Sequence, residues 1–196
     1  LTPRVDLVSM YIDQISDRDI GLGIAAEHGV TVYPSIVKAL TLGDDELAVD
    51  GVLLIGEHGD YAWNEKQQQL FPRKYFLEQI CGVMATSGRG VPVFNDKHLS
   101  YNWQDAQWMM ERMAGLAAPL MAGSSLPLVW RNPWLEHDLE TPIDEAVAIG
   151  FSGLEIYGFH ALEVMQCMVE RRAGGETGVA AVTCLGGDAV WRSAER

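Results

Sequence analysis

The chain has 196 residues, of which 48% are hydrophobic and 21% are charged, and these values exclude a disordered or fibrous protein. The formal net charge of -13 disfavours nucleic acid and anionic membranes as partners, because an acidic surface repels their phosphates. No apolar run reaches the ~18 residues that a membrane span needs, and no signal-peptide pattern opens the printed sequence. We therefore expect a cytoplasmic protein that binds neither nucleic acid nor membrane.

Short apolar segments rich in β-branched residues alternate with helical segments over the first two thirds of the chain. The segments with strand character are residues 5–12, 30–33, 49–56, 91–95 and 119–122. The segments with apolar residues at helical spacing are residues 17–28, 35–42, 73–87 and 102–116. This alternation with short connections predicts an α/β fold, with a Rossmann-like parallel sheet and helices on both of its faces.

Residue types mark the ends of two of these helices. We expect Ser35 to cap the start of helix 35–42, and Gly29 to end the helix before it. In helix 102–116, the spacing of the apolar residues predicts an inward face made of Trp103, Ala106, Met110 and Met113.

The residue composition changes near Pro127, where tryptophans, prolines and acidic residues replace the alternating pattern of strands and helices. We place a domain boundary here. Residues 1–127 are predicted to form a Rossmann-like nucleotide-binding domain, and residues 128–196 the beginning of a second domain that is too short to be complete. The elements predicted in this second part are helices at 142–149 and 159–172 and a strand at 179–184.

Ligands of parallel sheets bind beyond the carboxyl ends of the strands, so the polar residues that follow each strand are candidates for function. Asp13 follows the first predicted strand, where an acid can accept hydrogen bonds from the ribose hydroxyls of NAD; the alternative is an ordinary turn residue. The Gly-rich loop that normally precedes such an acid is absent, and we expect the first βα unit to lie before Leu1.

Polar residues also follow the next two strands of the expected sheet. Glu57 and His58 come after the most apolar strand, where neighbouring glycines permit a close approach of the backbone to a ligand; the alternative is a flexible polar loop. Asn95 ends the strand at 91–95, and Asp96, Lys97 and His98 follow it, so these four residues form the next candidate segment. A lysine at this position can polarise a substrate hydroxyl or carbonyl, or transfer a proton if burial lowers its pKa; the alternative is a solvated turn.

His160 and Glu163 lie three residues apart in a predicted helix and therefore share a face. Beside an acid, the histidine can serve as a general acid or base; the alternative is a buried histidine of the core. The spacing of the histidines and acids matches no metal motif, so we expect no metal site. Of the three cysteines, Cys81 and Cys167 lie in apolar helical patterns and are expected to be buried free thiols.

Three of these segments occur in the order and spacing of motifs in the Gfo/Idh/MocA family of NAD(P)-dependent oxidoreductases, which the chain resembles over nearly all of its length. The strand VDGVLLIG, residues 49–56, is similar to a family strand that reads vDaVviatpn. Lys97 stands where the family has the catalytic lysine of an EKP motif, with Asp96 in place of Glu. His160, with Glu163 three residues later, stands where the family has the histidine of a G-x-H-x-x-D signature.

The sequence also departs from the family pattern. His98 replaces the proline of EKP, Glu57 and His58 replace a common Pro-Asn pair, and Glu163 replaces the Asp of the signature. These changes indicate a divergent branch, in which the substrate and even the redox outcome can differ.

The resemblance implies a Rossmann domain followed by an α+β domain with an open antiparallel sheet. Because that sheet commonly packs between subunits in the family, we expect a homo-oligomer. The resemblance also implies hydride transfer between NAD or NADP and a hydroxyl of a sugar, cyclitol or related small polyol. Lys97 would orient and polarise that hydroxyl, and His160 would exchange its proton, oriented by Glu163 or Glu155. The residues implied at the cofactor are Asp13, Glu57, His58 and Asp96.

Two other interpretations stay open. Some members of the family use bound NAD for non-redox elimination or glycoside cleavage, which the extra acidic and basic groups of this chain would suit. A degenerate Rossmann scaffold without catalysis would account for the missing phosphate loop, and a chain without that loop need not bind the cofactor. The catalytic interpretation requires Asp13, Glu57 and Lys97 to share one rim of the sheet, and His160 to reach that rim from the second domain.

Overall fold

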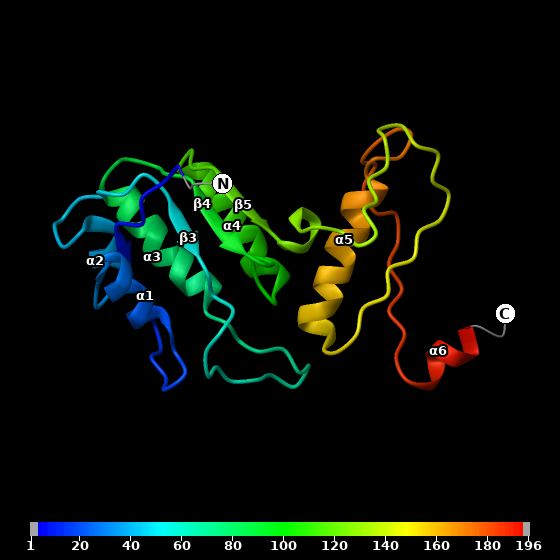
Figure 1. Cartoon of the computed structure of the whole chain (residues 1–196), viewed down its shortest axis with the longest axis horizontal. Coiled ribbons are helices and arrows are strands. Elements are labelled where there is room, and N and C mark those ends of the chain that lie inside the picture. Colours follow the sequence, from blue (N-terminus) through cyan, green and yellow to red (C-terminus); the bar gives the residue numbers. More distant parts are fainter. Residues whose placement is uncertain (1–3, 194–196) are drawn as a thin grey trace.

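The computed structural model describes residues 4–193, and its first part alternates strands with helices as the sequence predicts (Figure 1). In chain order the elements of this part are β1 (Ser9–Met10), α1 (Gly21–His28), β2 (Thr31–Val32), α2 (Ile36–Thr41), β3 (Val52–Leu54), α3 (Arg73–Thr86), β4 (Val93–Asp96), α4 (Trp103–Gly115) and β5 (Leu120–Gly123). Each lies within a segment predicted above, apart from the ends of β4 and β5, which run one residue further. The mixed α/β character, with parallel strands flanked by helices, is therefore confirmed and is compatible with a Rossmann-like fold.

The strands form two sheets rather than one. β1 pairs with β2, and a separate sheet has the order β3-β4-β5. All of the pairings are parallel: Ser9 lies beside Thr31, and Val93 in the central strand lies between Val52 and Leu120. Parallel pairing brings the carboxyl ends of β3, β4 and β5 to the same edge of their sheet.

Helices cover only one face of the three-stranded sheet in the described part of the chain. α2 packs beside α3, and α3 beside α4, and their apolar side chains form one core with Leu54 and Val93 of the strands. Leu53, Ile55 and Met121 lie on alternate positions and are 67%, 59% and 67% exposed. The expected helical cover on both faces is not found over these residues. A continuous apolar run indicates burial on both sides of a strand, but the neighbours that supply it are set by tertiary packing.

The predicted inward face of α4 is confirmed at Met113 and wrong at Trp103 and Met110. Met109 and Met113, four residues apart, are fully buried, whereas Trp103 and Met110 are 72% and 51% exposed. Adjacent residues point about 100° apart around a helix, so a small error in phase exchanges a buried methionine for an exposed one. The helix begins after Asn102, whose side chain accepts a hydrogen bond from the backbone N–H of Asp105.

Two predicted helix ends are confirmed. Ser35 caps α2, because its hydroxyl accepts a hydrogen bond from the N–H of Lys38 at 3.2 Å. Gly29 ends α1 in the left-handed conformation, with φ 66°.

The second part of the chain is helical or irregular. It contains a short 3-10 turn at Leu126–Leu128, a π-helical turn at Leu154–Gly158 that leads directly into α5 (Phe159–Val169), and α6 (Asp188–Ser193). In Figure 1, α5 lies beside the α/β part, joined to it by the chain that leaves β5, and α6 lies beyond α5, near the C-terminal end of the chain. The helix predicted at 159–172 is confirmed.

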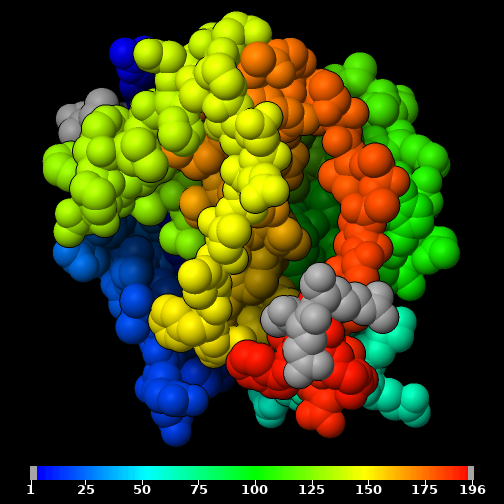
Figure 2. Space-filling view, turned by 90° about the vertical axis from the view of Figure 1, so that its right-hand side faces the viewer, coloured from blue at the N-terminus to red at the C-terminus, as the bar shows by residue number. Residues whose placement is uncertain are grey.

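The helix predicted at 142–149 and the strand predicted at 179–184 are wrong, because both segments are irregular. Apolar side chains in and beside these segments, such as Val147, Ile149 and Val182, are largely exposed. Figure 2 shows the two segments (yellow and orange-red) running over the face of the molecule on which α5 also lies. Residues 128–193 contain no strand of an open sheet. An apolar alternating pattern identifies a segment that can pair, but a strand also needs a neighbour.

Two adjacent methionines of α4 test this description of the core. We expect Met109→Ala to lower the free energy of unfolding by about 2–5 kcal/mol, because it leaves a cavity in a packed interior. The matched change Met110→Ala, at a half-exposed site, should cost less than about 1 kcal/mol. Urea denaturation followed by circular dichroism measures both values, and equal losses would contradict the observed burial.

Candidate functional site

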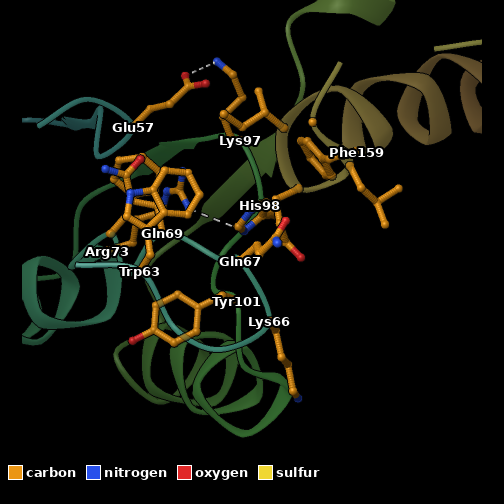
Figure 3. Close-up of a pocket in the computed structure, with 15 residues that line it drawn as sticks. Glu57, Trp63, Lys66, Gln67, Gln69, Arg73, Lys97, His98, Tyr101 and Phe159 are labelled. Atoms are coloured by element: carbon orange, nitrogen blue, oxygen red, sulfur yellow. Dashed lines mark hydrogen bonds and ion pairs between the residues drawn. The ribbon is translucent and has the colours of Figure 1, made fainter. Parts of the chain in front are cut away.

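A cavity of about 310 Å³ opens at the carboxyl ends of β3 and β4, beside the start of α5. We call it the lysine cavity. Its polar lining residues are Glu57, Lys66, Gln67, Gln69, Arg73, Lys97, His98, Tyr101 and Glu155. Its apolar lining residues include Trp63, Phe71, Leu154, Ile156 and Phe159 (Figure 3). Its position is where parallel sheets bind ligands, and its volume lies at the lower end of the range for small-molecule sites.

Lys97 forms two ion pairs at the edge of this cavity. Its Nζ lies 2.7 Å from Oε2 of Glu57 and 2.8 Å from Oδ2 of Asp96, and all three side chains are only 13–14% exposed. Burial lowers the pKa of Lys97, but the hydrogen bonds to Asp96 and Glu57 outweigh it and raise the pKa above its usual value. Lys97 is therefore a stable ammonium at neutral pH, which can donate hydrogen bonds but is a poor proton acceptor.

A buried amide holds the backbone around Lys97. Lys97 has a positive φ of 69°, a left-handed conformation that costs a non-glycine residue on the order of 1 kcal/mol. Its N–H donates to the carbonyl of Gly123, and its carbonyl accepts from the Gly123 N–H, both at 3.1 Å. The Nδ2 of Asn95, which is fully buried, donates to the carbonyls of Asp96, Lys97 and His98 at 3.3, 3.4 and 3.2 Å. Asn95 therefore positions the whole turn.

Sequence reasoning included Asn95 in the candidate segment 95–98 without giving it a role, and it missed Arg73. Asn95 carried a usable signal, because it is a polar residue at an inward position of an otherwise apolar strand, two residues after the buried Val93. Arg73 carried none, because it reads as the first residue of an ordinary amphipathic helix.

His98 is a neutral histidine next to a cation. Its Nδ1 lies 3.4 Å from Nη1 of Arg73, and since a guanidinium only donates, Nδ1 is the acceptor and the proton resides on Nε2. Burial, together with the charge of Arg73, lowers the pKa of His98 to about 4. The ring of His98 also meets Phe159 edge to face, with centroids 5.3 Å apart. His98 is therefore an uncharged ring on the wall of the cavity at neutral pH.

His160 and Glu163 lie at the end of β5, away from the lysine cavity. Ser124, which follows β5, has its hydroxyl 2.6 Å from Nδ1 of His160 and donates its backbone N–H to Glu163 at 3.1 Å. His160 lines a second cavity of about 540 Å³, the α5 cavity, which lies between α5 and residues 143–151. The two residues therefore join the second part of the chain to the sheet.

Lys97 and His160 do not line the same cavity, contrary to the arrangement that the catalytic interpretation requires. Their backbones are close, because Gly123 pairs with Lys97 and the next residue, Ser124, binds His160. The first residue of α5, Phe159, faces the lysine cavity instead. His160 follows it and points about 100° further around the helix.

Asp13 lies on a neighbouring loop and not in the lysine cavity. Its carboxylate accepts hydrogen bonds from the hydroxyls of Tyr11 and Tyr61 at 2.7 and 2.8 Å, and the bond to Asp13 raises the pKa of Tyr11 to about 12. The side chain of Gln14 bonds to the backbone of Asp60, so the loops after β1 and β3 do meet.

The residues expected at the cofactor are divided between two places. Glu57 and Asp96 bind Lys97, whereas Asp13 binds the two tyrosines. His58 lines neither cavity.

Other classes of site find no support in the described residues. Within residues 4–193, no group of three or more His, Cys, Asp or Glu side chains is placed to hold a metal ion. Cys81 is buried as expected, Cys167 is half-buried and Cys184 is exposed, all as free thiols. Over the same range, no helix has the length and apolar character to cross a membrane.

Comparison with protein-family models and with curated proteins finds no match for this sequence. The likeness to the Gfo/Idh/MocA family therefore rests on the motifs quoted above.

The low pKa of His98 predicts a pH-dependent contribution to stability. Folding lowers the pKa of His98 from 6.5 to about 4, so the unfolded chain binds an extra proton between these values. The stability that depends on neutral His98 is therefore fully present above about pH 6.5 and is lost as the pH falls toward 4. We expect His98→Gln, which keeps an acceptor for Arg73, to reduce this loss by on the order of 3 kcal/mol.

The measurement is urea denaturation between pH 4 and pH 8, with His28→Gln as the control, because His28 is exposed at the end of α1. The control should keep the wild-type pH dependence. Identical profiles for the two variants would show that His98 is not held neutral.

Proposed function

We propose that this protein is an oxidoreductase of the Gfo/Idh/MocA type, which uses NAD or NADP to oxidise or reduce a hydroxyl of a sugar, cyclitol or related small polyol. The observation that carries the proposal is the ammonium of Lys97, held between two carboxylates beside a polar cavity at the end of a parallel sheet. The resemblance of Asp96-Lys97 to the family's lysine motif supports it.

The lining of the lysine cavity suits a polyhydroxylated molecule. Gln67 and Tyr101 provide amide and phenol groups that both donate and accept hydrogen bonds, as sugar hydroxyls do. Gln69 provides its amide oxygen, because its Nε2 already donates to two backbone carbonyls. The indole of Trp63 is 60% exposed and offers an apolar surface to the C–H face of a sugar ring. The volume of about 310 Å³ suits one small ring rather than an oligomer.

Lys97 and Glu57 can play two different roles at the reacting hydroxyl. Bound NAD or NADP would accept the hydride from the carbon, or supply it in the reverse direction. The ammonium of Lys97 stabilises negative charge that develops on the oxygen, because it stays protonated and is partly removed from water. Glu57 is the carboxylate beside it that can accept the hydroxyl proton. His160, which lines the α5 cavity, has no part in this scheme.

The cofactor fits one part of the chain and not another. Asp13 uses two of its roughly four acceptor positions for the tyrosine hydroxyls, so it can still accept hydrogen bonds from a ribose. The start of α1 is a different place from the pyrophosphate loop, which in the family precedes the strand that carries the ribose-binding acid. It offers no anion site of its own, because Asp19 already accepts the N–H of Gly21 at 2.8 Å and its charge repels phosphate. A Rossmann scaffold that binds no nucleotide stays the second candidate.

Replacing Lys97 tests the proposal. Lys97→Met removes the ammonium but keeps an unbranched side chain, and we expect it to lower kcat by roughly 10²–10⁴-fold. The matched control is Lys74→Met, which removes another ammonium held 2.8 Å from a carboxylate, that of Asp105, outside the cavity. The control should keep wild-type activity.

Formation of reduced nicotinamide is followed by its absorbance with a panel of aldoses, aldonic and uronic acids and inositols, and NADH binding by its fluorescence. Failure of the wild-type protein to bind NADH would leave the scaffold. Full activity in Lys97→Met would remove Lys97 from the mechanism. Tightly retained nicotinamide without net reduction would point to the non-redox chemistry.

A further inference from the structure

We propose that the substrate of the lysine cavity carries a carboxylate, and that Arg73 binds it. The inference rests on the proposed function, because it names the substrate class that the same cavity takes. Arg73 is the first residue of α3, is 2% exposed and lines the cavity. The dashed line that ends on His98 in Figure 3 marks its contact with that histidine.

The guanidinium of Arg73 has fewer partners than a buried cation requires. Among residues 4–193 it makes one side-chain hydrogen bond, to Nδ1 of the neutral His98 at 3.4 Å, and no ion pair. Its Nε is buried and has no partner. Burying a charge is costly unless the charge is paired, so this arrangement is favourable only when a further acceptor is present.

Nearby acids do not supply the missing charge. Glu57 and Asp96 attract Arg73 from a distance, but both are bonded to Lys97 at 2.7 and 2.8 Å. Burial lowers the pKa of Arg73 in spite of these two acids. The two carboxylates therefore compensate the ammonium of Lys97 and leave the guanidinium short of negative charge.

Packing accounts for the stem of Arg73 but not for its N–H groups. The guanidinium lies over the ring of Phe71, 5.0 Å from its centroid. The stem lies against Gly56, where an added Cβ would meet Cγ of Arg73 at 3.0 Å. Neither contact accepts a conventional hydrogen bond, so within residues 4–193 the side chain of Arg73 has no acceptor besides His98.

A carboxylate fits this site better than a phosphate. The planar guanidinium matches the two oxygens of a carboxylate, and the uncharged ring of His98 beside it on the same wall does not compete with a ligand carboxylate for Arg73 as an acid would. The first turn of α3 has no side-chain cap and no acid, so the positive end of the helix adds to the attraction. Glu57 and Glu155 also line the cavity, and they repel a phosphate dianion more than a singly charged carboxylate.

The test compares ligands that share a ring and differ in one group. Isothermal titration of the whole protein, saturated with NADH if it binds, uses glucose with glucuronate, galactose with galacturonate, and glucose 6-phosphate. We expect the acid of at least one pair to bind roughly tenfold or more tightly than its neutral partner, as a hydrogen bond to a charged group provides. Arg73→Gln should abolish that preference and leave the neutral sugar unaffected, and Arg73→Lys should keep part of it.

Circular dichroism checks that the Arg73 variants fold, and Arg89→Gln, at a surface ion pair with Asp50, is the control that should keep the preference. The wild-type comparison decides the matter even if neither Arg73 variant folds. Equal binding of acid and neutral sugar in every pair, binding of no sugar, or tighter binding of the phosphate ester would overturn the inference.

The outcomes also separate this inference from the proposed function. Turnover of neutral sugars with no preference for acids would contradict the proposed carboxylate site but not the proposed oxidoreductase activity. Binding of acids through Arg73 without any nicotinamide chemistry would support the carboxylate site and contradict the oxidoreductase activity.

Discussion

The ion pairs of Lys97 with Glu57 and Asp96 hold together the end of the sheet on which the site is built. Glu57 follows β3 and Asp96 ends β4, and the parallel register places Leu54 beside Asn95, so both carboxylates come to one edge. Burying three charges is tolerable only while each is paired. The turn that brings the ammonium there needs a left-handed Lys97, which the amide of Asn95 and the backbone of Gly123 hold in place.

The lysine cavity contains two cations, Lys97 and Arg73, and nearby carboxylates neutralise the first more fully than the second. The hydrogen bonds of Lys97 raise its pKa despite burial, whereas burial lowers the pKa of Arg73 despite the two acids nearby. The two carboxylates lie at hydrogen-bonding distance from Lys97, whereas they act on Arg73 only over a longer distance. This inequality gives the cavity two different functions in our proposals: Lys97 is fixed for work on an oxygen of the substrate, and Arg73 is left open to an anion.

The second part of the chain contributes to the cavity through the first turn of α5. Ser124 binds both His160 and Glu163 and so fixes α5 against the end of β5. This contact directs Phe159 into the lysine cavity, against the ring of His98, and turns His160 toward the α5 cavity. His160, which sequence reasoning assigns to chemistry, thus also links the two parts of the chain.

Local patterns were enough to predict the alternating elements, the cap at Ser35, the end of α1 at Gly29 and the place of Lys97 and His98 after a strand. These features depend on residues close in sequence, so periodicity and residue type determine them. Long-range packing decided the division into two sheets, the choice of Met109 over Met110, the pairing of Lys97 with Glu57, the burial of Arg73 and the separation of His160 from Lys97. The physical reason is that one residue turns a helix by about 100° and a strand to its other face, and only the surrounding contacts select among those directions.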